Sequence, residues 1–196
     1  MPMKSESKVA YIAWKLRVIA HLVLGRKQEA ENALDAMLQR WPDDAYARSS
    51  RAHLRHQRQA LQAALEDAQH LVQAHPTRSA ADWFNLAYLL EADSQLERAL
   101  AAFQQAVALD PKLDRAWYGL GLLLIRLQRL DEAVQALKRN TELQPMSPYG
   151  WYQLARVHMD RQQPEEARRI LVHLQGFEPK VAAQLARETG LAVEVR

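Results

Sequence analysis

The chain has 196 residues, of which 48% are hydrophobic, and this is enough for one or two domains with buried cores. Cysteine is absent, which excludes disulfides, thiol catalysis and cysteine-ligated metal sites. The formal net charge of +3 is too small to indicate nucleic-acid binding by itself, and the low glycine content favours helices.

An apolar run over residues 9–24 is the first predicted helix. Lys15, Arg17 and His21 interrupt it, so it is too short and too charged to span a bilayer, and no signal-peptide cleavage site follows. We therefore expect a cytoplasmic protein without a membrane span. The helix is apolar almost all round, so part of its surface could pair in a homodimer or contact a partner. The alternative is full packing on the next helix.

A tryptophan recurs at a constant interval in the chain, at Trp83, Trp117 and Trp151. Each is followed at fixed distances by an alanine and then by a proline, and Trp14 keeps the same spacing. Arg48 replaces the tryptophan in one unit. The pattern predicts an N-terminal tail over 1–10, a C-terminal capping helix and tail over 182–196, and five units between them: 11–44, 45–79, 80–113, 114–147 and 148–181.

Each unit is predicted to be two helices joined by a turn. In the fourth unit, Asp114 is expected to cap a first helix, and a second helix is expected to end near Leu143. Pro145 prevents its continuation because proline lacks an N–H group. One extra residue lies between Pro76 and Trp83, where a connection can absorb it.

Two glycines lie inside a predicted helix of the fourth unit. Gly121 stands where other units have alanine, so we expect a close helix crossing there, with Ala133 as the facing residue. Gly119 has polar counterparts in other units, so we expect it to face a groove beside Tyr118 and to tolerate a larger side chain.

A helix-turn-helix unit of this length, with this combination of tryptophan, leucine, small residues and proline, resembles the tetratricopeptide repeat. The third unit carries the pattern most fully: Trp83, Leu86, Ala87, Ala99, Phe103, Ala106 and Pro111. The second unit departs most, because Arg48, Arg51 and Arg55 occupy first-helix positions that normally pack inward. The resemblance implies an all-α, right-handed superhelical solenoid whose first helices line a concave groove for a peptide or helix of another protein.

The resemblance places the groove residues beside the tryptophans on the first helices: Phe84, Asn85, Tyr88, Arg115, Tyr118, Leu122, Arg126, Tyr149, Tyr152, Gln153 and Arg156. Aromatic and arginine side chains are enriched where proteins bind proteins. The alternative is that the aromatic rings only pack between neighbouring first helices.

An arginine stripe marks the second unit. Arg48, Arg51, Arg55 and Arg58 are spaced so that they share one helix face, which is compatible with an anion site or nucleic-acid binding. The alternative is that the arginines extend to water while neighbours such as Glu66 and Asp67 neutralise some of them.

Catalytic motifs are missing from the sequence. It has no glycine-rich phosphate loop, nucleophile elbow or paired-carboxylate motif, and His53 and His56 lack further ligands at a telling spacing. We therefore expect no enzyme activity, cofactor or metal. The sequence predicts a protein-interaction scaffold, such as an adaptor, assembly factor or chaperone, that binds an apolar segment with some acidic residues. Nucleic-acid or anion binding through the arginine stripe is the alternative.

Overall fold

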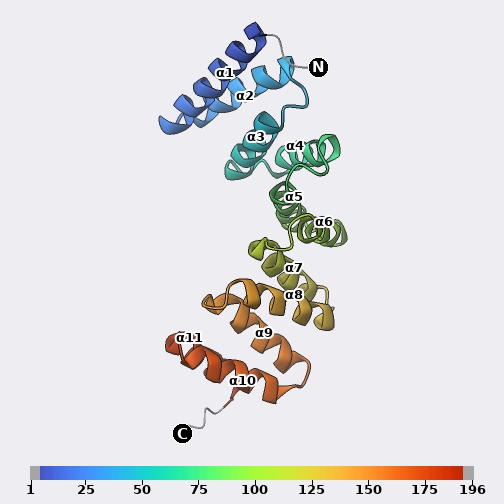
Figure 1. The fold of residues 1–196 in the computed structure, drawn as a ribbon, viewed down its shortest axis with the longest axis vertical. Coiled ribbons are helices and arrows are strands. Elements are labelled where there is room, and N and C mark those ends of the chain that lie inside the picture. The colour runs from blue at the N-terminus through green and yellow to red at the C-terminus, as the bar shows by residue number, and fades with distance from the viewer. Residues whose placement is uncertain (1–4, 192–196) are drawn as a thin grey trace. The chain divides into compact units, whose positions relative to one another are not determined.

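The structure, a computed structural model, describes residues 5–191, with side chains from Lys8 onward. Eleven helices and no strand occur in this range (Figure 1), so the predicted all-α architecture is confirmed. None of the described helices is long and apolar enough to cross a membrane. The chain divides into two compact units, Met1–Asp93 and Ser94–Arg196, called here unit 1 and unit 2 and described separately.

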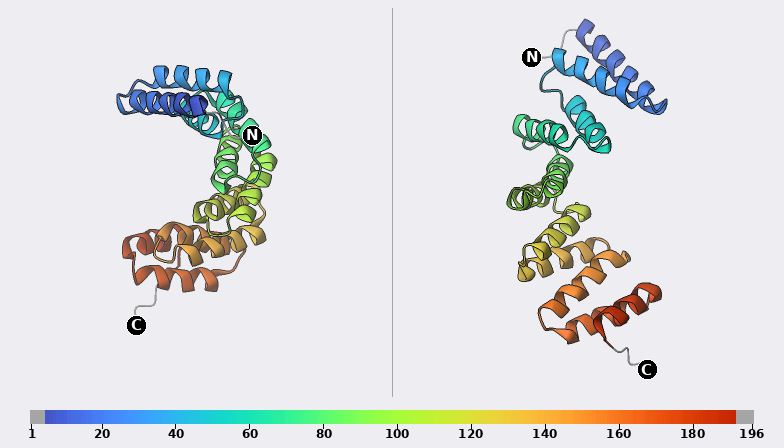
Figure 2. Two further views of the ribbon diagram at one scale, coloured as in Figure 1. Left: turned by 45° about the horizontal axis from the view of Figure 1, so that its top comes forward. Right: turned by 180° about the vertical axis from the view of Figure 1, so that it is seen from behind.

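Unit 1 contains five helices, and each packs against the next along the chain: α1 (Ser5–Val23), α2 (Lys27–Arg40), α3 (Ala45–Gln57), α4 (Leu61–Ala74) and α5 (Ala80–Ala92). The first two lie side by side (Figure 2). Because α1 begins at Ser5, residues 5–10 are helical and not the tail that the sequence analysis expected. No glycine or proline interrupts the chain from Met3 to Leu24, so nothing delays the start of the helix.

Unit 2 contains the remaining six helices: α6 (Leu96–Leu109), α7 (Asp114–Arg126), α8 (Leu130–Leu143), α9 (Pro148–Asp160), α10 (Pro164–Gln175) and α11 (Pro179–Thr189). The last of these, α11, packs on both α9 and α10. It ends at Gly190, whose φ of 69° is left-handed, as a glycine helix stop requires. Its apolar side buries Ala182 and Leu185 on unit 2, which suits a capping helix.

The turns that end the first helices share one backbone device. A left-handed residue recurs at Gly25, Gln59, Ser94, Gln128 and Gln162. After it, the next N–H donates back to a carbonyl of the preceding helix, as from Ala60 to Arg55 and from Arg129 to Leu124, both at 2.9 Å. This is the Schellman arrangement, and it satisfies carbonyls that a helix end leaves open. The backbone thus repeats this left-handed turn at the same interval as the sequence pattern.

The tryptophans tie each first helix to the proline before it. The indole Nε1 donates to the proline carbonyl in the pairs Trp83–Pro76, Trp117–Pro111 and Trp151–Pro145, at 2.7, 3.0 and 2.9 Å. The first pair is one residue longer than the others, so the extra residue is absorbed in this connection. In the second predicted repeat, Arg48 makes the same link, with two guanidinium N–H groups donating to the Pro42 carbonyl at 3.2 and 3.1 Å.

The expected cap at Asp114 is not present. Asp114 is the first residue of α7, and Leu113 precedes it without a side-chain cap bond. The carboxylate still lies in the first turn, where it favours the positive end of the helix dipole. True side-chain caps occur in unit 1, where Asp44 accepts the N–H of Ala47 at 2.7 Å and Ser79 accepts that of Ala81 at 3.1 Å.

Both glycines of α7 lie at close helix contacts. A Cβ on Gly121 would lie 2.7 Å from Cγ of Leu137, so a small residue is required there, although the facing residue is Leu137 and not Ala133. A Cβ on Gly119 would lie 2.6 Å from a ring carbon of Phe103, which is buried on α6. The expectation that Gly119 faces an open groove and tolerates a larger side chain is therefore wrong, because α6 packs against it.

Candidate functional site

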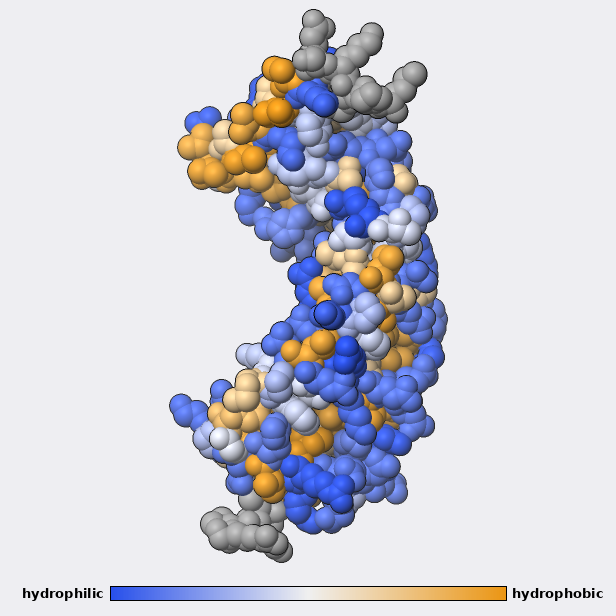
Figure 3. Space-filling view, in the orientation of Figure 1, coloured by the Kyte–Doolittle hydropathy of each residue, from blue (hydrophilic) through white to orange (hydrophobic). Residues whose placement is uncertain are grey.

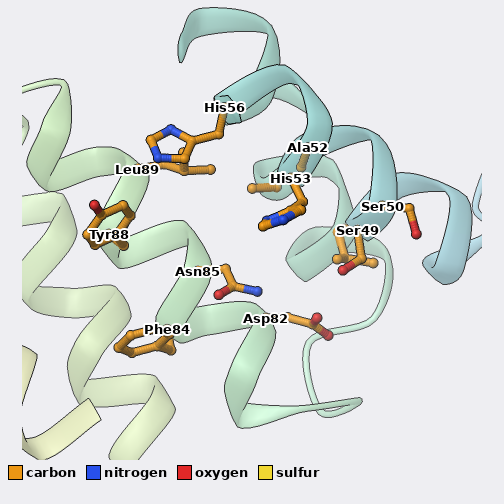
Figure 4. A pocket seen from close by; sticks show the side chains of 12 residues that line it. Ser49, Ser50, Ala52, His53, His56, Asp82, Phe84, Asn85, Tyr88 and Leu89 are labelled. Carbon is orange, nitrogen blue, oxygen red and sulfur yellow. The ribbon is translucent and has the colours of Figure 1, made fainter. Parts of the chain in front are cut away.

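A pocket of about 530 Å³ opens between α3 and α5 of unit 1 (Figure 4). Its apolar lining includes Ala52, Leu71 and Leu89. Ala68 is a fourth apolar lining residue, and the others are polar or aromatic: Ser49, Ser50, His53, His56, Asp82, Phe84, Asn85 and Tyr88. The rings of His56 and Tyr88 meet edge to face at 5.5 Å between centroids, which fixes one wall.

Three of the predicted groove residues, Phe84, Asn85 and Tyr88, line this pocket. Their counterparts on α3 were not among the predicted groove residues. Ser49 and His53 stand one repeat before Phe84 and Tyr88, so the period itself was the signal that could have identified them. Tyr88 remains 52% exposed, which leaves a large ring available to a bound molecule.

Asp82 gives the pocket a polar group that is incompletely paired. The residue is only 5% exposed, and its Oδ1 accepts a hydrogen bond from Arg78 at 2.5 Å. Its Oδ2 is buried and, within the described residues, has no hydrogen-bond partner. A buried acceptor without a donor is unfavourable, so this oxygen is an energetically costly feature of the pocket wall.

The groove residues of unit 2 lie on α7 and α9. Burial raises the pKa of Tyr118, and a hydrogen bond with Gln153 acts in the opposite direction. Tyr118 is half-buried and is held in place by this hydrogen bond, whereas Tyr149 beside it is 70% exposed. Arg115 and Arg126 reach the surface and Leu122 is half-buried.

At the far end of this face, α11 contacts one predicted groove residue, Tyr152. The hydroxyl of Tyr152 donates to the carboxylate of Glu188, and this bond raises the pKa of Tyr152 and lowers that of Glu188. The guanidinium of Arg156 lies 5.9 Å from the centroid of the Tyr152 ring. The capping helix thus closes this end of the face, and Tyr149 and Tyr118 form its more open part.

The arginine stripe of α3 points into the hairpin, where it surrounds one carboxylate. Asp67 on α4 is 1% exposed and accepts hydrogen bonds from Arg48 at 3.0 Å, from Arg51 at 2.5 and 2.8 Å, and from Arg55 at 2.9 Å. The side chains of the three arginines are only 13–18% exposed. The alternative that the arginines extend to water is therefore wrong for these three, whereas its expectation that Asp67 neutralises some of them is confirmed.

Carboxylates of α2 complete this ionic network. Asp35 pairs with Arg51 at 2.6 Å, and Glu31 pairs with Arg55 at 3.0 Å. Burial disfavours the charged form of Arg51, but its bonds to Asp67 and Asp35 outweigh this and raise its pKa. Glu31 also pairs with Arg58, so every arginine of the stripe has a carboxylate partner. Glu66, the other expected neighbour, is exposed.

The described residues contain no group of three His, Asp or Glu side chains that could hold a metal ion. His53 instead shares a hydrogen bond of 2.8 Å with Gln57.

Comparison with solved structures gives close likenesses of fold. A crystal structure of MamA protein has a TM-score of 0.77 at 18% identity, covering 92% of this chain and 96% of that one. The structure of YrrB, described as a TPR protein with an unusual peptide-binding site, has a TM-score of 0.76 at 19% identity, covering 87% and 88%. A tetratricopeptide repeat protein from Parabacteroides merdae has a TM-score of 0.78 at 22% identity, covering 92% and 73%. These likenesses confirm the predicted α-solenoid fold.

A search of curated proteins gives no match. The family model described as tetratricopeptide repeat matches residues 15–79, 84–148 and 118–173, which together are more than half of the chain. This confirms the family predicted from the tryptophan, alanine and proline spacing. The chain belongs to the tetratricopeptide repeat family.

Proposed function

We propose that this protein is a non-enzymatic interaction module that binds a segment of a partner protein on the faces of its first helices. The pocket between α3 and α5 carries the proposal. It combines an apolar lining with an exposed tyrosine and with the side-chain amide of Asn85, which can donate and accept. Such a mixture of apolar surface and few polar groups is typical of recognition sites.

The chemistry of the pocket favours a peptide segment. An apolar side chain of the segment would fill the space against Leu89 and Phe84, while backbone groups would pair with Asn85. The peptide-binding site for which the YrrB structure is described supports this proposal by analogy of fold.

Unit 2 offers a separate candidate surface, the open part of the α7–α9 face, with Tyr149 as its exposed anchor. The exposed arginines of this face favour acidic residues in the bound segment. A role as adaptor, assembly factor or chaperone, and a cytoplasmic location, stay predictions from the sequence. Self-association through α1 also stays a prediction.

A display library of random peptides tests the proposal on the protein itself. Peptides selected on the wild-type protein should lose about 2 kcal/mol or more of binding to Asn85→Ala/Tyr88→Ala, because central aromatic anchors dominate interface energies. Gln73→Ala, which changes an exposed residue of α4, is the matched control and should bind unchanged. In unit 2, Tyr149→Ala and Gln135→Ala form the same comparison. A library that yields no binder, or binders indifferent to both tyrosines, would overturn the proposal.

The alternative function, nucleic-acid or anion binding through the arginine stripe, is less well supported. Phosphate contacts need available positive charge, and all four arginines are paired with carboxylates of the protein. We expect no binding of a labelled single-stranded RNA at physiological salt. Salt-sensitive binding that Arg51→Glu/Arg55→Glu abolishes, in a variant that remains folded by circular dichroism, would favour the alternative.

A further inference from the structure

The outer face of α1 carries an apolar strip. Its five residues are spaced 3, 4, 3 and 4 apart, so they lie along one side of the helix: Val9, Ile12, Leu16, Ile19 and Val23. Their exposed fractions lie between 45% and 81%. Figure 3 shows apolar residues gathered over α1 at the upper left of the molecule.

The opposite side of α1 is already used by the fold. Val18 is completely buried in a cluster with residues of α2 and α3, and Tyr11 and Trp14 pack against the same cluster. The helix is therefore docked on its inner side, and the strip is a second apolar face that unit 1 leaves uncovered. Large exposed apolar patches mark interaction surfaces.

Cations lie beside the strip and farther around the helix. Lys8 and Lys15 flank the strip on one side, Arg17 lies nearer the docked side of α1, and no acidic residue occurs from Lys8 to Val23. Lys15 lies 4.3 Å from the centroid of the Tyr46 ring, and Arg17 lies 5.3 Å from that of Trp14. Arg26 and Lys27 follow in the next turn, and the acidic Glu29 comes only after them.

From this arrangement we propose that α1 is a docking face for an anionic lipid bilayer. An apolar helix face bordered by Lys and Arg is the arrangement of helices that lie in the membrane interface, where the side chains enter the acyl boundary and the cations contact lipid head groups. Each such cation is also attracted by an anionic leaflet. The strip is about 21 Å long at about 1.5 Å per residue, so α1 would lie along the surface.

A second copy of the chain fits the strip less well. The strip spans only two heptads, and a coiled coil that stands by itself needs about three to four. Pairing two copies would also bring two sets of cations together, and Glu6 is the one acidic residue in the sequence of α1. A lipid surface needs no matching seam, and its charge complements that of the helix.

Vesicle flotation tests the proposal. The wild-type protein should float with vesicles of phosphatidylcholine that contain about a third phosphatidylglycerol, and much less with phosphatidylcholine alone. Ile12→Gln/Leu16→Gln should lower the partition coefficient at least about tenfold, because burial of exposed aliphatic groups drives the insertion. Met146→Gln/Val172→Gln removes equally exposed apolar side chains from unit 2 and should change nothing.

Two double variants test the contribution of the positive charges to vesicle binding. Lys8→Gln/Arg17→Gln should reduce binding to the anionic vesicles only, by about tenfold. Lys138→Gln/Lys180→Gln removes the same charge from exposed positions of unit 2 and should have no effect. Because the natural chain lacks cysteine, an environment-sensitive dye on Ile19→Cys gives a second readout, with Val172→Cys as its control. The dye at position 19 should shift to the blue on anionic vesicles.

Three outcomes would overturn the proposal. One is the absence of flotation with the anionic vesicles. Another is flotation that Ile12→Gln/Leu16→Gln leaves unchanged, which would locate the lipid contact elsewhere. The third is a dimer in analytical ultracentrifugation that this double variant abolishes while vesicles bind neither form, which would make a second copy of the chain the occupant.

Discussion

The hairpin α7–α8 of unit 2 buries aliphatic side chains between its helices, among them Leu120, Leu124 and Ala136. The hairpin α3–α4 of unit 1 has charged residues at the corresponding positions of the repeat: Arg51, Arg55 and Asp67. Both hairpins nevertheless end their first helix with the same left-handed turn. The repeat backbone therefore accepts an apolar or an ionic interior, provided that apolar side chains pack together or that charges of opposite sign pair.

The two interiors differ in what they cannot tolerate. In the ionic hairpin, three guanidinium groups share one buried carboxylate, so the loss of that carboxylate leaves an excess of buried positive charge that Asp35 and Glu31 offset only in part. In the apolar hairpin, charge is absent and volume decides, because Gly121 leaves no room beside Leu137. The predictions below separate these two sensitivities.

The largest effect is expected for Asp67→Asn. Removing the shared carboxylate charge should lower the free energy of unfolding by about 3–5 kcal/mol, since Arg48 would lose its carboxylate partner and Arg51 and Arg55 would keep only those of α2. The midpoint of urea denaturation measures this. Glu66→Gln, one residue earlier and exposed, should stay within about 0.5 kcal/mol of the natural protein. A similar loss in both variants would contradict the ionic network.

Volume should matter more than charge in unit 2. Gly121→Leu is expected to lower the free energy of unfolding by about 1–3 kcal/mol, because its side chain would overlap Leu137. Gly119→Leu should have an effect of the same order through Phe103. Denaturation midpoints test both variants, and a Gly119→Leu protein as stable as the natural one would restore the open-groove interpretation.

A smaller effect is expected at the contact between α8 and α9. Asn140 is 5% exposed and donates to the Asp114 carbonyl at 2.9 Å, and a Cβ on Gly150 would overlap its Oδ1. Gly150→Ala should therefore destabilise by about 1–2 kcal/mol. Asn140→Ala/Gly150→Ala recreates the alanines found at the same repeat positions of α6 and α7, so a double-mutant cycle should show recovery. Additive losses would mean that the two residues do not interact.

The smallest effect is a gain in stability. Gln128 and Gln162 adopt left-handed backbone conformations, with φ of 59° and 58°, which a side chain disfavours. Gln128→Gly is expected to stabilise unit 2 by about 0.5 kcal/mol, since glycine removes the steric cost but adds chain entropy in the unfolded state. Thermal denaturation measures it. Gln135→Gly, inside α8, is the control and should destabilise by about 1 kcal/mol.

The fold followed from the sequence because the repeat is periodic. The spacing of Trp83, Trp117 and Trp151 predicted the family, and the extra residue before Trp83 was located correctly. The fine contacts did not follow, because they depend on how neighbouring helices cross. Gly119 was placed by the character of its counterparts in other units, and the position of Phe103 on α6 could not be read from that.

The candidate site was partly predictable for the same reason. Phe84, Asn85 and Tyr88 were identified from their place beside a tryptophan, but the half of the pocket on α3 was obscured by the degenerate second unit. The destination of the arginines was also hidden. Their shared helix face followed from their spacing. Their pairing with Asp67 of α4 and with carboxylates of α2 depends on how the three helices pack.

The most direct test of a structural role for these arginines is the free energy of unfolding of Arg51→Leu/Arg55→Leu/Asp67→Ala. This variant replaces the centre of the ionic network with the residues that α7 and α8 carry. Arg48 would keep its bonds to the Pro42 carbonyl, and Glu31 would keep Arg58. We expect its free energy of unfolding to equal that of the natural protein or to exceed it by as much as about 4 kcal/mol. A triple variant that is as unstable as Asp67→Asn alone would contradict this account.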